Sequence, residues 1–254
     1  MKLYRTILYP KLFGNRLHRL IHTCCILQKK IPSNLKGKGV SSQQWLVRQL
    51  NDPYVEKAKL LNYRCRSAFK LLEIDDKYKF LKPGSTVIDC GAAPGSWTQV
   101  AVNRVFVFSN PSVPKGLVIA IDKQYIHPIE NAIILGNSDF TQKQAQDKIF
   151  GILGKTKANV VLSDMAPNAT GIKEIDIENM LNLCYSALRF AVQVSENNAT
   201  FLVKLWYCND LSILEKDIQR FYGDVKIVKP KASRDDSAEV FILGRYFKGL
   251  VSDS

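Results

Sequence analysis

The feature that most constrains the fold is the segment VIDCGAAPGSW, residues 87–97. A short apolar strand ends at an acid, runs into a glycine-rich turn and continues as a predicted helix. In open α/β sheets this is where a nucleotide-like cofactor binds. Gly91 and Gly95 are interpreted as positions where a side chain would block the ligand. The turn alone is also compatible with a strand-to-helix connection that binds nothing.

The spacing of this turn indicates which cofactor it suits. Residues 91–95 read G-A-A-P-G, which differs from the G-x-G-x-x-G of a dinucleotide fold. Asp89 closes the strand and Pro94 stiffens the turn, and this variant favours S-adenosylmethionine over NAD. An NAD-dependent dehydrogenase stays an alternative, because it would use the same turn, but it leaves a lysine inside an apolar strand, Lys204, without a role.

Apolar strands alternate with helical patterns along the chain. Predicted strands cover residues 86–89, 117–122, 133–135, 158–164, 200–205, 225–228 and 239–243. Predicted helices cover residues 64–80, 96–107, 141–153, 174–195 and 210–221, and residues 110–116 are a predicted loop. This alternation predicts an α/β fold, with a mostly parallel sheet and helices on both faces.

The N-terminal part of the chain differs in charge from the rest. The first 51 residues hold ten Lys and Arg side chains and no Asp or Glu, so they carry most of the net charge of +13. Residues 1–38 are predicted to be a mitochondrial transit peptide, cleaved or disordered, with a basic RNA-binding arm as the alternative. No apolar run reaches the ~18 residues of a membrane span, so none is expected.

Residues 39–254 are predicted to form a single catalytic domain. Its N-terminal extension, residues 41–62, mixes Arg48, Lys57 and Lys59 with aromatic residues. This suits a nucleic-acid surface, although an ordinary amphipathic helix explains it equally well. The six cysteines lack the spacing of a zinc site, so we expect reduced thiols and no metal.

Three acids follow successive predicted strands, at the edge where open α/β sheets bind ligands. Asp122 would accept hydrogen bonds from a ribose, Asp139 from an adenine amine, and Asp164 would lie beside a methionine-like group. One acid at a strand end is often only a cap for the next helix. Three in succession after a glycine turn favour a ligand site.

Two lysines lie where apolar residues would be expected. Lys204 is inside an apolar strand, and Lys70 lies between Phe69 and Leu71. Each side chain can extend to solvent, which is the simpler explanation for Lys70 taken alone. A buried amine held among carboxylates is also suited to act as a base, and Glu239, which opens the last strand, is a candidate partner.

Together these residues resemble the FtsJ-like RNA ribose 2′-O-methyltransferases. Lys70, Asp164, Lys204 and Glu239 match that family's K-D-K-E tetrad in order and context. The contexts are RSAFKL, SDMAPN, FLVK and K-P-x-A-S-R-x-x-S-x-E, and DCGAAPGSWTQV matches the cofactor turn. The resemblance covers about residues 41–247, and the segments LSDMAPNATG, DPYV and YRCRSAFKLLEI are most similar to the mitochondrial large-subunit rRNA branch of the family.

The resemblance implies a Rossmann-like methyltransferase fold with a seven-stranded sheet and S-adenosylmethionine as methyl donor. The implied catalytic residues are Lys70, Asp164, Lys204 and Glu239, with Lys204 as proton acceptor. The implied cofactor-binding residues are Gly91, Ala93, Pro94, Gly95, Trp97, Asp122, Asp139 and Asp164.

The implied substrate is a uridine ribose in the peptidyl-transferase region of mitochondrial large-subunit rRNA, free or in a pre-ribosomal particle. We expect a monomer in the mitochondrial matrix that supports ribosome assembly.

The chain departs from many members after Lys204, where an aromatic residue and a glycine are replaced by Leu205 and Trp206. A non-catalytic assembly factor is the main alternative function. A DNA or small-molecule methyltransferase would have no reason to carry both lysines.

Overall fold

The computed structural model describes residues 32, 37, 39–106 and 115–250. The predicted transit peptide lies outside these residues, apart from 32 and 37, as does most of the loop predicted at 110–116. The chain divides into two compact units, Met1–Asn51 and Asp52–Ser254. Most of the described residues of the first unit lie in helix α1 (Val40–Leu50). The domain boundary after residue 38 stays a prediction.

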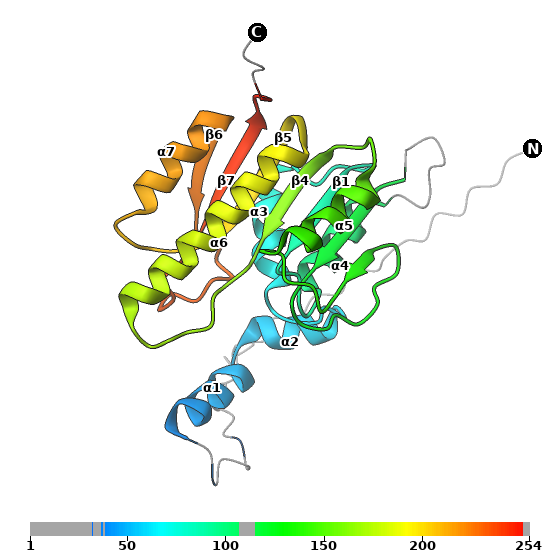
Figure 1. Ribbon diagram of the computed structural model, residues 1–254. Coiled ribbons are helices and arrows are strands. Elements are labelled where there is room, and N and C mark those ends of the chain that lie inside the picture. Colours follow the sequence, from blue (N-terminus) through cyan, green and yellow to red (C-terminus); the bar gives the residue numbers. More distant parts are fainter. Residues whose placement is uncertain (1–31, 33–36, 38, 107–114, 251–254) are drawn as a thin grey trace, which may run out of the picture. The chain divides into compact units, whose positions relative to one another are not determined.

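A seven-stranded sheet forms the centre of the described part of the second unit (Figure 1). Its strands are β1 (Thr86–Cys90), β2 (Leu117–Ile121), β3 (Ile133–Leu135), β4 (Ala158–Ser163), β5 (Ser195–Trp206), β6 (Tyr222–Val228) and β7 (Glu239–Phe247). Their order in the sheet is β3-β2-β1-β4-β5-β7-β6. The first five strands pair in parallel, and β7 is antiparallel to both β5 and β6. The predicted mostly parallel sheet is confirmed.

Helices cover both faces of this sheet, as the alternation of elements predicts (Figure 1). They are α3 (Ala68–Tyr78), α4 (Ser96–Val105), α5 (Lys143–Leu153), α6 (Lys173–Val194) and α7 (Leu211–Phe221). Helix α2 (Pro53–Leu60) lies off the sheet and buries Ala58 in a small cluster with Phe69 and Ala232. Buried side chains of α5, α6 and α7 belong to one core cluster, and those of α3 and α4 belong to another. None of the helices in the described ranges is long and apolar enough to cross a membrane.

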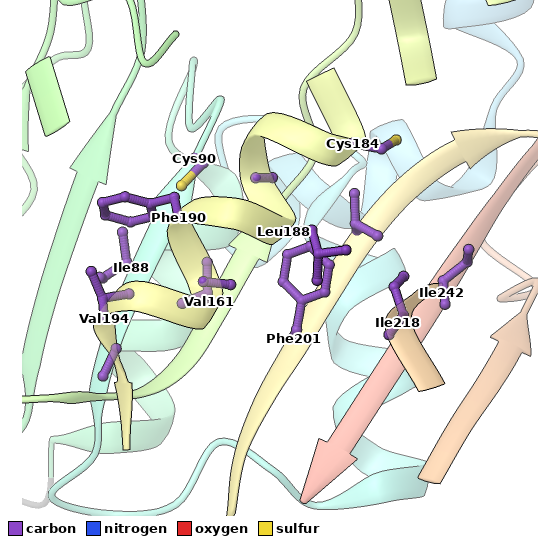
Figure 2. Packing of buried hydrophobic residues seen from close by; sticks show 14 of the residues in the cluster. Ile88, Cys90, Val161, Cys184, Leu188, Phe190, Val194, Phe201, Ile218 and Ile242 are labelled. Carbon is purple, nitrogen blue, oxygen red and sulfur yellow. The ribbon is translucent and has the colours of Figure 1, made fainter. Parts of the chain in front are cut away.

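The two core clusters follow from the alternation of side chains along each strand. Successive strand residues point to opposite faces of a sheet. On β1, Val87 therefore packs with α3 and α4, whereas Ile88 packs with the cluster that contains Phe190 of α6. Figure 2 shows the second arrangement, with Ile88 and Phe190 beside Val161 of β4. All three side chains are almost completely excluded from solvent.

Several element boundaries differ from the predicted ones. The extension at 41–62 contains two helices, because Pro53 starts a new helix that Asp52 caps by accepting from the Tyr54 amide at 3.0 Å. Strand β5 begins at Ser195 rather than at residue 200, since Ser195 pairs with Ala158 although exposed polar residues follow it. Polar composition hid this start from sequence analysis.

Candidate active site

A cavity of about 590 Å³ lies beside the glycine-rich turn, where the parallel strands β1, β2 and β4 end. Five of the predicted cofactor residues line it: Gly91, Ala93, Asp122, Asp139 and Asp164. Carboxyl ends of parallel strands meet at one edge of a sheet, so residues distant in sequence converge there. The volume is in the range of small-molecule sites.

The cavity wall also contains residues that sequence analysis did not single out. Phe140 and Thr141 follow Asp139, and the polar side chains Asn179 and Asn182 reach the cavity from α6. The α6 residues had no sequence signal, because polar positions on a surface helix are common. Their role depends on the packing of α6 across the strand ends.

Asp122 fixes the glycine-rich turn from the neighbouring strand. Its Oδ2 atom accepts from the Ala93 amide at 2.9 Å, and Oδ1 accepts from the Gln124 amide at 2.7 Å. A carboxylate oxygen has more than one acceptor position, so both oxygens can still accept from a ligand hydroxyl. The carboxylate is thus held rigidly at the cavity wall.

Asp139 is held by one oxygen and keeps the other for further bonding. Its Oδ1 atom accepts from both the hydroxyl and the amide of Thr141, at 2.7 and 2.9 Å. These hydrogen bonds hold the pKa of Asp139 below its ordinary value. The Oδ2 atom takes no part in these bonds, and the ionised group can accept from a ligand amine.

The two glycines of the turn are required by the protein's own packing. Gly91 has φ +76°, and a Cβ there would lie 2.4 Å from Met165 Cγ. Gly95 has φ +110°, and its Cβ would lie 2.7 Å from Arg64 Nη1 and from Ile129 Cδ1. The interpretation that a ligand alone excludes side chains here is therefore incomplete, because protein atoms already exclude them.

Pro94 and Gly95 lie in the glycine-rich turn and Trp97 lies in the first turn of α4, and none of the three lines the cavity. The Trp97 ring is only 2% exposed, lies 5.7 Å from the Phe241 ring, and donates its Nε1 hydrogen to the Ser67 carbonyl at 2.9 Å. The Pro94 carbonyl accepts from Arg64 Nη1 at 2.7 Å. The Trp97 side chain therefore belongs to the core, and the cofactor roles of these three residues stay predictions.

The four tetrad residues come together as two ion pairs. Lys70 Nζ lies 2.7 Å from Glu239 Oε2, and Lys204 Nζ lies 2.9 Å from Asp164 Oδ1. These residues come from α3, β7, β5 and the end of β4. Asp164 also lines the cavity, so the Lys204 pair is adjacent to it.

Lys204 is buried, as its place in an apolar strand predicts, and only 9% of it is exposed. Its ammonium group also donates to the main-chain carbonyl of Asp164 at 2.5 Å. The simpler explanation, in which this lysine extends to solvent, is therefore wrong. After Lys204, where the resemblance leads us to expect a glycine, β5 continues through Trp206, and the exposed Tyr207 donates its amide to the Ala238 carbonyl at 2.7 Å.

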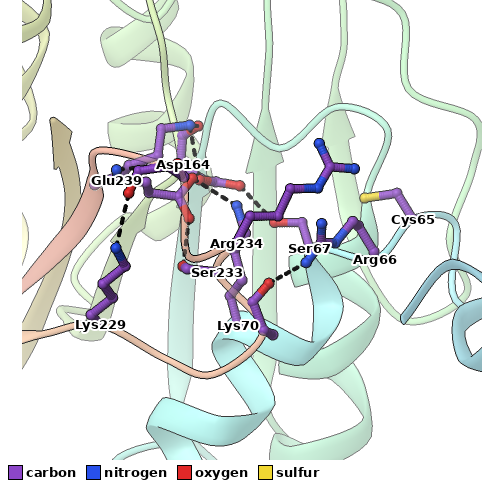
Figure 3. Close-up of polar contacts among 12 residues, drawn as sticks. Cys65, Arg66, Ser67, Lys70, Asp164, Lys229, Ser233, Arg234 and Glu239 are labelled. Carbon is purple, nitrogen blue, oxygen red and sulfur yellow. Dashed lines mark hydrogen bonds and ion pairs between the residues drawn. The ribbon is translucent and has the colours of Figure 1, made fainter. Parts of the chain in front are cut away.

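Two serines hold the outer oxygens of the tetrad carboxylates. Ser67 Oγ donates to Asp164 Oδ2 at 2.8 Å, and Ser233 Oγ donates to Glu239 Oε1 at 2.8 Å. Figure 3 shows both serines among the residues around Asp164 and Glu239. Each carboxylate therefore offers one oxygen to a serine and the other to a lysine. Sequence analysis quoted both serines within motifs but gave them no role.

The loop between β6 and β7, which carries Ser233, is fastened to α2 and α3. Arg234 Nη2 and Arg66 Nη1 both contact Asp52 Oδ2, at 3.2 and 2.5 Å. Glu73 accepts from the amide of Ala232 at 3.0 Å. The ion pair between Arg234, which follows Ser233 in the loop, and Asp52 thus fixes the loop whose Ser233 positions Glu239.

Asp89 is a buried acid behind the cavity. Burial raises its pKa to about 7, the Thr98 hydroxyl opposes this by donating to Oδ2 at 2.7 Å, and the charges of Asp164 and Asp122 add to the rise. Within the described residues its Oδ1 atom has no hydrogen-bond partner. Asp89 is therefore a group that releases its proton near neutral pH.

The described cysteines are free thiols, as expected. Cys90 and Cys184 are buried, and burial raises the pKa of the Cys184 thiol to about 12. Among the described side chains, no group of three or more His, Cys, Asp or Glu residues could hold a metal ion. The expectation that the reaction needs no metal stays a prediction.

Comparisons with known proteins agree with this geometry. Residues 63–247 match the model of the FtsJ-like methyltransferase family. The chain is 55% identical to the Drosophila melanogaster protein named rRNA methyltransferase 2, mitochondrial, over 92% of this chain and 94% of that one. It is 44% identical to the ribosomal RNA large subunit methyltransferase E of Cereibacter sphaeroides, over 86% and 89%.

A solved structure supports the same fold. A Plasmodium falciparum protein described as a ribosomal RNA methyltransferase superposes with a TM-score of 0.64 at 29% identity. The match covers 74% of this chain and the whole of that one. The part of this chain that the match covers therefore shares the fold of that protein.

Proposed function

The chain belongs to the FtsJ-like methyltransferase family, and we propose on this basis that it methylates a ribose 2′-hydroxyl of mitochondrial large-subunit rRNA. The observation that carries the proposal is the pair of ion pairs, Lys70–Glu239 and Lys204–Asp164, beside the cavity. A dehydrogenase would have no use for a buried lysine, Lys204, and a partly buried one, Lys70, each paired with a carboxylate at this end of the strands.

The cavity fits S-adenosylmethionine in its chemistry. Asp122 and Asp139 offer carboxylate oxygens for the ribose hydroxyls and the adenine amine, and Asp139 has an oxygen that its bonds to Thr141 do not use. Asp164 offers a negative charge near the end of β4 for the methionine part. When bound there, S-adenosylmethionine supplies an electrophilic methyl group for the ribose oxygen.

The tetrad supplies the base and the positioning. Lys204, in its neutral form, accepts the proton of the 2′-hydroxyl, and Asp164 orients the lysine amine through the 2.9 Å contact. Lys70 and Glu239 hold the ribose in line with the methyl group. Holding two reacting atoms at attack distance supplies a large share of an enzyme's rate acceleration.

We infer the location and the substrate with support from the relatives and from the composition of the leader. The Drosophila relative is named as a mitochondrial rRNA methyltransferase, and residues 1–38 have the composition of a transit peptide. We therefore place residues 39–254 in the mitochondrial matrix as one catalytic domain, acting as a monomer on a uridine of the large-subunit rRNA, free or in a pre-ribosomal particle. The modification would support ribosome assembly.

The proposal is tested with tritium-labelled S-adenosylmethionine, the full chain, and either mitochondrial large-subunit rRNA or pre-ribosomal particles. Digestion of the product to nucleosides, followed by mass spectrometry, should give 2′-O-methyluridine as the labelled species. Label on a base, or on a protein, would contradict the proposed reaction. Binding of cofactor with no transfer to either substrate would favour the assembly-factor alternative.

A further inference from the structure

A second cavity, of about 320 Å³, lies at the end of the strands opposite to the tetrad. Its wall comes from the end of α3, the starts of β4 and β5, and the end of β7, and includes Tyr78, Asn159, Arg245 and Tyr246. The cavity thus lies at the amino ends of the parallel strands, whereas the proposed methyl-transfer site lies at their carboxyl ends. The volume is at the lower end of the range for small ligands, and suits a single nucleotide.

Two tyrosines enclose an arginine at this cavity. The Arg245 guanidinium carbon lies 5.2 Å from the Tyr78 ring centre and 5.3 Å from that of Tyr246. Asp224 Oδ2 holds the same guanidinium group, 2.9 Å from Nε and 2.5 Å from Nη2. The ion pair with Asp224 thus fixes the arginine in place, and its guanidinium group contacts both tyrosine rings through cation–π interactions.

Tyr246 is in an unfavourable backbone conformation while half of its surface is exposed. Its φ is +61°, and the side chain is 53% exposed. The other described non-glycine residues with positive φ are four asparagines and Lys79, and asparagine tolerates this region far better than a tyrosine does. Such strain costs energy and is concentrated at functional sites. The ring contacts the Arg245 guanidinium on one side and leaves about half of the residue's surface open at the cavity, so burial in a core does not account for the strain.

The charged and polar groups around the rings suit an anionic ligand with a polar edge. Lys79 and Lys82 are exposed at the cavity, and Glu196 is the carboxylate in its wall. Asp76 Oδ1 lies 3.4 Å from Lys79 Nζ in a solvent-exposed ion pair. Glu196 accepts from the amide of Asn159, which occupies part of its acceptor capacity. The exposed amides of Asn197 and Asn198 complete the wall. An aromatic face beside lysines is the arrangement that binds unpaired nucleotides, by stacking and phosphate contact.

We propose that this cavity binds an unpaired nucleotide of the RNA substrate, with its base on the Tyr246 ring and its phosphate at Lys79 and Lys82. The inference rests on the proposed function for its RNA ligand. Strand β7 links the two sites, since Glu239 begins the strand and Tyr246 lies seven residues along it. At roughly 3.3 Å per residue the sites are about 23 Å apart, so one RNA can contact both.

The test compares Tyr246→Gly with Tyr246→Phe. Glycine accepts a φ of +61°, so the first variant removes the ring without adding backbone strain, and the second keeps the ring. Binding of a fluorescein-labelled single-stranded oligouridine is measured by anisotropy at fixed ionic strength. Loss of one stacked base should raise the Kd of Tyr246→Gly about 5- to 100-fold, and Tyr246→Phe should stay within about twofold of the parent.

Methyl transfer to the large-subunit rRNA separates this inference from the proposed function. Tyr246→Gly should raise the KM for rRNA and leave the rate at saturating rRNA unchanged. Equal oligouridine affinity in parent and Tyr246→Gly, or no binding by the parent, overturns the inference while methyl transfer still stands. Ring-dependent binding without methyl transfer leaves the nucleotide site in place and overturns the proposed reaction. Photocrosslinking from position 246 to a ribosomal protein instead of RNA also overturns the inference.

Discussion

Changing Asp89 to asparagine should alter how the stability of this protein depends on pH. Asp89 is completely buried at the end of β1, and burial raises its pKa from 3.8 to about 7. The unfolded chain releases this proton near pH 4, whereas the folded protein keeps it to about pH 7. Between these values the folded state binds more protons, so the contribution of Asp89 to the free energy of unfolding falls as the pH rises.

The size of this effect follows from the difference between the two pKa values. One pKa unit corresponds to about 1.4 kcal/mol. From pH 5 to pH 8, linkage gives a loss of about 3 kcal/mol in the free energy of unfolding of the parent. Asparagine does not titrate, so the variant should lack this loss. The parent should therefore lose stability relative to Asp89→Asn as the pH rises.

The measurement is urea unfolding at pH 5, 6, 7 and 8, followed by circular dichroism, for the parent and Asp89→Asn. The exposed Asp147 of α5, changed to asparagine, provides the matched control. If the difference between parent and Asp89→Asn stays constant, or grows in favour of the parent with rising pH, the account of Asp89 as a buried, protonated acid is wrong.

Two further predictions follow from the site. Removing the Ser233 hydroxyl with Ser233→Ala should lower kcat about 10- to 100-fold, because Glu239 loses the hydrogen bond that orients it. The KM for S-adenosylmethionine should stay unchanged, and Ser233→Thr should recover part of the kcat. A parent-like kcat in Ser233→Ala would show that the 2.8 Å bond is dispensable. Gly91→Ala should lower the free energy of unfolding by at least about 2 kcal/mol, because the backbone φ is +76° and a Cβ would collide with Met165. Gly151→Ala should raise the free energy of unfolding by about 0.5–1 kcal/mol, because a Cβ at this position in α5 meets open space. Thermal unfolding compares the two glycine variants, and equal shifts in Tm would contradict the packing argument.

The sheet and the convergence of the acids were predictable from sequence because both depend on local pattern. An apolar strand followed by an acid places Asp122, Asp139 and Asp164 at one edge once the strands run in parallel. The pairing of Lys204 with Asp164 was not predicted from local pattern, although the adjacency of β4 and β5 brings the two residues together. Sequence analysis named Glu239 as a candidate partner for a buried lysine, and Glu239 pairs with Lys70. The predictions of the sheet and of the acids at the strand ends needed no knowledge of side-chain packing.

What sequence analysis missed depends on the rotation of helices and on long-range contacts. The rotation of α4 turns the Trp97 ring toward Phe241 and away from the cavity, and no local pattern encodes that choice. The bond from Ser233 to Glu239 depends on a loop that Arg234 fixes to Asp52, 182 residues away in sequence. The backbone strain at Tyr246 is likewise visible only in three dimensions.

The most direct test of the central claim compares Lys204→Ala with Lys216→Ala, an exposed lysine of α7 that serves as the matched control. Methyl transfer to mitochondrial large-subunit rRNA and the affinity for S-adenosylmethionine, by calorimetry, are measured on both variants and the parent. We predict that Lys204→Ala loses methyl transfer and still binds S-adenosylmethionine, while Lys216→Ala behaves as the parent. Methyl transfer by Lys204→Ala at the parental rate would contradict the assignment of Lys204 as the base.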